Sequence, residues 1–153
     1  MKYRDYLLSA KRHSHACKIL QEKIDITDNT PINDDDKNYL ALNLYYLSGY
    51  IIECSLKFKI FESFGFEHDL DITKDTCSTK GINYNKKIKT HNFIKLLEYL
   101  QTKVPDISYS SDIEEINDLL SKWQPELRYI HATIDYEKVK QLYTHAKLFL
   151  RKI

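Results

Sequence analysis

The chain has few of the residues that interrupt helices and build tight turns: among 153 residues it carries three glycines and three prolines. All-β folds need frequent turns and usually contain more of both residues, so this scarcity favours helices. Three isolated glycines also cannot form a glycine-rich phosphate loop, and no Gly-x-Ser-x-Gly elbow occurs. The sequence therefore predicts an all-α protein without these glycine-built enzyme motifs.

Paired cysteines, excess charge and long apolar runs are also missing. Cys17, Cys54 and Cys77 show no paired spacing, which argues against a disulfide framework or a zinc site and favours a reducing cytoplasm. The formal net charge of +1 argues against wholesale wrapping of nucleic acid. No apolar run approaches the roughly 18 residues of a membrane span, and the start of the chain has no continuous apolar stretch. We therefore expect a cytoplasmic protein with neither a membrane span nor a signal peptide.

Apolar residues instead recur at helical spacing in five segments. The pattern predicts helices over about 3–24, 35–63, 90–105, 110–124 and 135–153, with a polar loop at 25–37. Thr90 and either Ser110 or Ser111 are the expected N-caps of the third and fourth helices. We expect one domain over residues 1–153, folded as a four- or five-helix up-down bundle with an irregular loop insertion at about 64–89.

The run LYYLSGYIIECSLKF, residues 44–58, holds polar residues inside the longest apolar stripe. Ser48 and Gly49 make a flat spot where another helix backbone can approach, and Glu53 lies at its edge with Lys57 one turn on. A carboxylate beside close-packed backbone is costly unless it is paired. The simpler interpretation is an exposed Glu53–Lys57 pair on a solvent face. The alternative ties Glu53 to a distant cation such as Arg128, which would fix the core geometry or a site.

Basic residues are concentrated between Lys74 and Lys103, where seven lysines face only two acidic residues. The densest part contains Lys86, Lys87 and Lys89, which are candidate phosphate-binding residues. The simpler interpretation is a solvated surface. A phosphate-binding strip would show strong salt dependence.

The segment WQPELRYIHATIDYE brings Arg128 and His131 within one helical turn. Arginine can hold a phosphate bidentately and histidine can transfer a proton near neutral pH, so the pair suits metal-free RNA cleavage. The alternative is a structural corner in which Trp123 and Tyr129 pack and Arg128 pairs with Glu53 or Glu126. The six histidines show no metal-ligand spacing, so we predict no metal and no cofactor.

Two stretches of the sequence, one of them overlapping the run 44–58, together resemble HEPN domains (higher eukaryotes and prokaryotes nucleotide-binding). LSGYIIECSLKFKI is similar to the central helix of that family, in which a small-residue spot precedes a glutamate and a lysine, here Gly49, Glu53 and Lys57. THNFIKLLEYL resembles the next landmark, a histidine at a helix start followed by spaced leucines, here His91 and Leu96. The resemblance covers about residues 3–150 and implies a four- or five-helix bundle, usually a homodimer.

Many HEPN members are ribonucleases with an arginine and a histidine separated by four to six residues, and no arginine here has a histidine at that spacing. The resemblance therefore implies a nucleotide-, RNA- or partner-binding module of a bacterial toxin–antitoxin or antiviral defence system, without catalytic activity. Its partner would be a nucleotidyltransferase or a defence-system protein. The expected ligand or structural network comprises Glu53, Lys57, His91 and Tyr129. The alternatives are a metal-independent endoribonuclease using Arg128 and His131, and a structural subunit docked on a larger enzyme.

Overall fold

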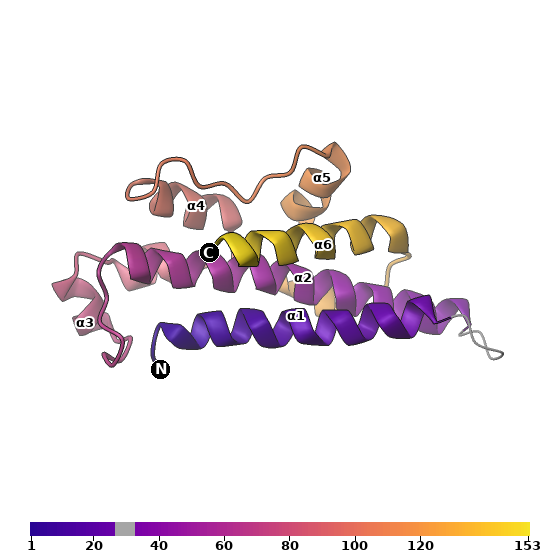
Figure 1. Ribbon diagram of the computed structural model, residues 1–153, viewed down its shortest axis with the longest axis horizontal. Coiled ribbons are helices and arrows are strands. Elements are labelled where there is room, and N and C mark those ends of the chain that lie inside the picture. The colour runs from indigo at the N-terminus through magenta and orange to yellow at the C-terminus, as the bar shows by residue number, and fades with distance from the viewer. Residues whose placement is uncertain (27–32) are drawn as a thin grey trace.

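Three long helices lie side by side and form the body of the protein in the computed structural model, which describes residues 1–26 and 33–153 (Figure 1). They are α1 (Arg4–Asp25), α2 (Asp34–Ser63) and α6 (Tyr136–Lys152). Helix α1 runs antiparallel to α2 and α6, and α2 contacts both of the others (Figure 1). The predicted all-α class is confirmed, and the long helices form a bundle.

Shorter helices cover the remaining side of α2 and one side of α6. Helix α4 (Phe93–Gln101) packs on α2, and α5 (Glu114–Lys122) packs on α6. A 3₁₀ turn, η2 (Pro125–Tyr129), also contacts α2. The five predicted helices thus correspond to α1, α2, α4, α5 and α6.

Helix α2 is central because it is covered on almost every face between Leu44 and Phe61. Leu44, Ile51 and Leu56 are completely buried, and each buried aliphatic side chain of this size contributes about 1.5–3 kcal/mol. The helix begins with Asn33, whose side chain accepts a hydrogen bond from the Asp36 amide, and acidic residues fill its first turn as its dipole favours. Because this part of the helix is covered from several sides, the polar residues within it are held in place by neighbouring segments.

Segment 64–89, predicted as an irregular insertion, contains two helical elements. Helix α3 (Lys74–Thr79) has a capping box formed by Thr73 and Thr76, and a π-helical turn, η1 (Tyr84–Ile88), follows it. The segment buries four side chains in the main core: Phe66, Cys77, Ile82 and Ile88. These elements are too short to produce a periodic sequence pattern, which is why they were not predicted.

Two predicted helix starts are wrong. Asn92, not Thr90, caps α4 by accepting from the Lys95 amide, and the Thr90 hydroxyl instead accepts from the Asn92 amide. Helix α5 begins after Ile113 without a side-chain cap, because the Ser111 hydroxyl accepts from the Ile113 amide, ahead of the helix. Of the predicted polar loop at 25–37, residues 27–32 lie outside the described residues.

The cysteines follow the same packing logic as the other small apolar residues. Cys17, Cys54 and Cys77 are all buried and free.

None of the helices in the described ranges is both long enough and apolar enough to cross a membrane.

Candidate functional site

The glutamate of α2 is buried, and each of its two oxygens has a partner. Glu53 is 3% exposed; its Oε1 lies 2.7 Å from Lys57 Nζ and its Oε2 lies 2.8 Å from His91 Nδ1. The expected exposed Glu53–Lys57 pair is therefore wrong in its location, since Lys57 is also buried. The distant partner is His91, not Arg128, because Glu53 faces the segment before α4 and not η2.

This Glu53–Lys57–His91 network fastens the segment before α4 to the central helix. Burying an ion pair costs several kcal/mol in desolvation, and full hydrogen bonding is what offsets that cost. Lys57 also lies over the ring of Tyr6, 5.8 Å from its centroid. Only His91 reaches the surface, with about half of its side chain exposed. Both carboxylate oxygens have partners, so the Glu53 carboxylate itself is not a free general base.

The flat spot at Ser48 and Gly49 receives a side chain, not the helix backbone that was predicted. A Cβ atom at Gly49 would overlap the indole of Trp123. The Trp123 Nε1–H donates to the carbonyl oxygen of Tyr46 at 3.1 Å, and the indole stacks on Phe93 with centroids 4.8 Å apart. Trp123 thus joins α2, α4 and the end of α5 at one point.

Aromatic rings from separate segments surround Tyr50, which is itself partly exposed. The ring centroids nearest to it belong to Tyr46 at 5.0 Å, Trp123 at 5.1 Å, His13 at 5.6 Å and His91 at 6.2 Å. Burial raises the pKa of Tyr50, and so does its hydrogen bond to Tyr46. The sequence had given no signal for this cluster, because its members are far apart along the chain.

Arg128 and His131 lie at one edge of this cluster. Both are exposed, and they line a cavity of about 110 Å³ beside Tyr46. Arg128 lies over the ring of Tyr129, 4.7 Å from its centroid, and a hydrogen bond to Tyr46 raises the pKa of Arg128. In the described part of the chain Arg128 has no carboxylate partner, so the predicted pairing with Glu53 or Glu126 is wrong. We use the name Tyr50 surface for the exposed portions of Tyr46, Tyr50, His91 and Arg128.

The predicted phosphate-binding lysines do not form a pocket. Lys86 and Lys87 belong to η1 and Lys89 follows it, and all three are exposed. Lys87 lies over the Tyr99 ring at 5.4 Å. Their surroundings are solvent and one ring, so they form an exposed strip next to the segment that leads to His91.

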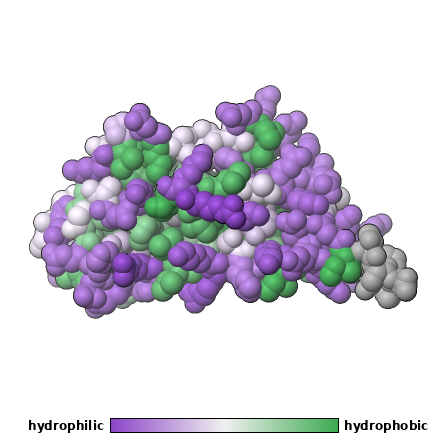
Figure 2. All heavy atoms as spheres, viewed as in Figure 1, coloured by the Kyte–Doolittle hydropathy of each residue, from purple (hydrophilic) through white to green (hydrophobic). Residues whose placement is uncertain are grey.

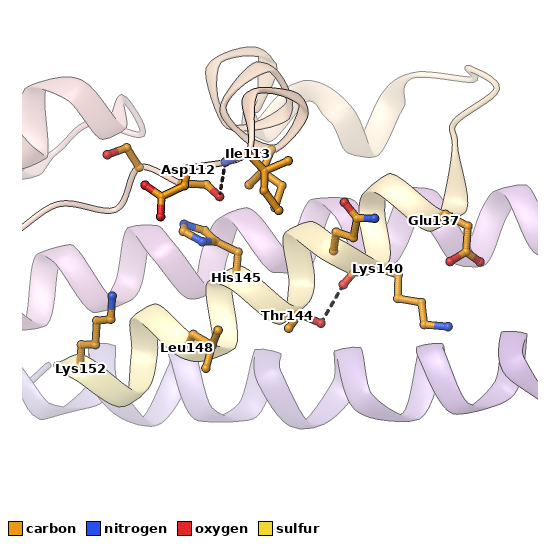
Figure 3. A pocket seen from close by; sticks show the side chains of 12 residues that line it. Asp112, Ile113, Glu137, Lys140, Thr144, His145, Leu148 and Lys152 are labelled. Carbon is orange, nitrogen blue, oxygen red and sulfur yellow. Dashed lines mark hydrogen bonds between the residues drawn. The ribbon is translucent and has the colours of Figure 1, made fainter.

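The larger cavities lie along α6, away from the predicted site residues. One cavity, of about 500 Å³, lies between α6 on one side and α5 with the segment before it on the other. His145 of α6 and Asp112 of that segment lie across it from each other, and Glu137, Lys140 and Lys152 lie along α6 (Figure 3). Its lining mixes both signs of charge with apolar residues such as Leu148. Another cavity, of about 580 Å³, separates α1 from α6 and has a basic lining.

No family model, no curated protein and no solved structure matches this chain. Within residues 1–26 and 33–153, no three His, Cys, Asp or Glu side chains are grouped as metal ligands would be. The Tyr50 surface and the two cavities are therefore the features of the molecule that bear on its function.

Proposed function

We propose that the chain is a HEPN-like module that binds nucleotides at the Tyr50 surface, either free or as part of an RNA strand, without cleaving them. The observation that carries this proposal is the meeting of Tyr46, Tyr50, His91 and Arg128, from α2 and two distant segments, on one exposed surface. Such a combination of rings and a fixed cation suits a ligand with both a base and a phosphate.

Each component has a physical role in this interaction. A base stacked on an exposed aromatic ring is worth about 1–3 kcal/mol, and every base has a face that can stack. Arg128 presents a planar guanidinium that can hold phosphate oxygens bidentately. The ring of Tyr129 lies against that guanidinium, which reduces the conformational entropy lost when it binds.

Binding without catalysis is favoured by the state of the buried carboxylate. Glu53 has both oxygens occupied, so it cannot accept a proton from a ribose hydroxyl without losing one of these two contacts. The cavity beside Arg128 and His131 holds about 110 Å³, well below the roughly 300 Å³ of typical small-ligand sites. A nucleotide would therefore lie on the surface and not inside a closed reaction chamber.

The test is isothermal titration with a panel of 5′-mononucleotides and with a short single-stranded RNA. Tyr50→Leu and Arg128→Ala should each weaken nucleotide binding at least tenfold. Arg4→Ala removes an equally exposed arginine from the start of α1 and serves as the matched control, with affinity unchanged. The proposal fails if the wild-type chain binds none of these ligands, or if the control weakens binding as much as Arg128→Ala.

A second candidate function is a metal-independent endoribonuclease, and the shared cavity of Arg128 and His131 is the observation in its favour. Arg128 would hold the phosphate while His131 takes the proton of the 2′-hydroxyl. The 2′-oxygen attacks that phosphate, the bond from phosphorus to the 5′-oxygen breaks, and the 5′-oxygen takes a proton from water. The products would be a 2′,3′-cyclic phosphate and a 5′-hydroxyl. RNA cleavage that persists in EDTA and disappears in His131→Ala would establish this function and displace binding without cleavage.

The resemblance to HEPN domains is also the basis of a proposal about the oligomeric state of the protein and the system in which it acts. We propose a homodimer acting in a toxin–antitoxin or antiviral defence system, with a nucleotidyltransferase or a defence protein as partner. Light scattering on the purified chain tests the dimer directly, since a monomer at all concentrations would contradict it. A stable homodimer would also count against an obligate structural subunit docked on a larger enzyme.

A further inference from the structure

We infer that the cavity between α1 and α6 binds the phosphate backbone of a single-stranded nucleic acid. We call it the α1–α6 groove; it holds about 580 Å³ and its lining is Lys11, Ser14, His15, Lys18, Gln21, Glu22, Tyr143, Lys147 and Arg151. In the view of Figure 2, hydrophilic side chains predominate around the outside of the molecule and hydrophobic ones are visible near its middle. This inference does not depend on the proposed function, since the groove and the Tyr50 surface share no residue.

The groove concentrates positive charge in a chain that is almost neutral. Lys11, Lys18, Lys147 and Arg151 face one carboxylate, that of Glu22, whereas the whole chain has a net charge of +1. Glu22 lies 3.6 Å from Lys18, and both side chains are more than half exposed, so this pair is weak. Among the described residues, Lys11, Lys147 and Arg151 have no carboxylate partner. Three cations are therefore available to an anion from outside.

The basic side chains form two facing rows at a repeated spacing. Lys11, His15 and Lys18 follow one side of α1, and Lys147 and Arg151 follow the facing side of α6. A helix rises about 1.5 Å per residue, so residues four apart are separated by about 6 Å along its axis. Such rows can contact successive phosphates of an extended strand, whereas a single anion would need only one of them.

The floor of the groove is polar and fixed. The Tyr143 hydroxyl donates to the Ser14 carbonyl oxygen at 3.0 Å and so ties α6 to α1 beneath the cations. Lys147 lies over the Tyr143 ring at 5.3 Å, which holds its ammonium above that floor. A rigid groove requires little reorganisation when a ligand enters it.

The lining favours a nucleic acid strand over a membrane surface. A helix face that inserts into a lipid interface carries large apolar residues beside its cations. Tyr143 is the one apolar side chain among the lining residues, and it is buried in the floor. The surface is also concave, which suits a strand lying along the groove. A positively charged groove that follows the backbone is one component of sequence-tolerant single-strand binding, the other being aromatic rings on which bases stack.

The experiment is fluorescence anisotropy with labelled oligo(U) and oligo(dT) of equal length across a salt series. The groove variants are Lys147→Glu/Arg151→Glu and Lys11→Glu/Lys18→Glu. Lys23→Glu/Lys138→Glu is the matched control, because it changes the net charge equally on the same two helices, at exposed positions outside the groove. Each groove variant should weaken binding at least tenfold. It should also reduce the slope of log affinity against log salt by about 1.4, since each lost phosphate contact contributes about 0.7 for single strands.

Three results would overturn the inference: no binding by the wild-type chain at low salt, a control as weak as the groove variants, or equal competition by poly-glutamate. Similar affinity for oligo(U) and oligo(dT) is expected because the backbone is the ligand. Circular dichroism checks that each variant folds. Lys147→Gln/Arg151→Gln removes the same charges without reversal, and it replaces any charge-reversed variant that does not fold. Loss of mononucleotide binding in Tyr50→Leu would leave this result unaffected, so the two proposals fail separately.

Discussion

The indole of Trp123 occupies the space that a side chain at Gly49 would need, and its Nε1–H donates to the Tyr46 carbonyl oxygen one turn earlier in α2. Glycine in the middle of a helix normally costs stability, because it loses more conformational entropy than alanine. Here the absence of a Cβ lets the chain's one tryptophan lie directly on the helix backbone. The contact closes the gap between α2, α4 and the end of α5.

Gly49→Ala should therefore lower the free energy of unfolding by about 1–2 kcal/mol. Overpacking in a core costs about 1–3 kcal/mol, and the higher helix propensity of alanine offsets up to about 1 kcal/mol of that. Urea denaturation followed by tryptophan fluorescence measures both the stability and the environment of Trp123. In the Trp123→Ala background the same substitution should cost less, since the two residues are in contact. Circular dichroism follows unfolding in that background, because it contains no tryptophan. A Gly49→Ala variant that is more stable than wild type would contradict the close approach.

Substitutions of Glu53 and Lys57, singly and together, test whether the two buried charges stabilise each other. Lys57→Met leaves a buried carboxylate with His91 as its remaining partner, and breaking such a pair costs about 3–5 kcal/mol. Glu53→Leu/Lys57→Met removes both charges, so it should cost clearly less than the sum of the two single substitutions. Chemical denaturation of the four proteins gives this coupling energy. Strict additivity would show that the pair is solvated and contributes no coupling.

The helices were predictable because their signals are local. The apolar spacing within 35–63 and the acidic residues at its start define α2 to within a residue. The same stretch also indicated a Glu53–Lys57 pair, because residues four apart share a helix face. Its burial was not predictable, since it depends on α4 and on the segment that carries His91. Local pattern gives the face of a helix, but not what covers that face.

The candidate sites show the same limit more strongly. Tyr50 meets His13, His91 and Trp123 through tertiary packing, and no sequence spacing connects those positions. The α1–α6 groove did leave a signal in the sequence, the three- and four-residue spacing of Lys11, His15 and Lys18. The net charge of the whole chain gave no indication of it. The lysine-rich stretch at 86–89 attracted attention through density along the chain, whereas the groove gathers its cations across two helices.

The buried thiols should resist modification in the native protein. Burial raises the pKa of Cys17 and of Cys54 to about 12, and it also raises the pKa of Cys77. The thiolate is the reactive form, so these groups are both protonated and inaccessible at mildly alkaline pH. Ellman's reagent should detect no thiol before unfolding and all three in denaturant. Rapid reaction of any one thiol in the native protein would show that its segment opens without global unfolding.

His13 should make the protein less stable in mild acid. Burial lowers the pKa of His13, and Arg12 lowers it further, while Glu53 opposes both. The unfolded chain, with a histidine pKa of about 6.5, then binds more protons than the folded one as the pH falls. The stability contributed by neutral His13 is therefore fully present above about pH 6.5 and is lost as the pH falls through the folded-state pKa.

Two variants isolate this effect from the other titrating groups. His13→Phe keeps a ring against Tyr50 but cannot titrate, so its unfolding free energy should fall less between about pH 7.5 and pH 5 than that of wild type. Arg12→Gln should lie between the two, because removing that charge raises the folded-state pKa of His13 toward its unfolded value. Parallel pH profiles for wild type and His13→Phe would show that His13 titrates alike in both states. They would also place the imidazole in solvent and not against Tyr50, which would remove one ring from the cluster on which the Tyr50 surface rests.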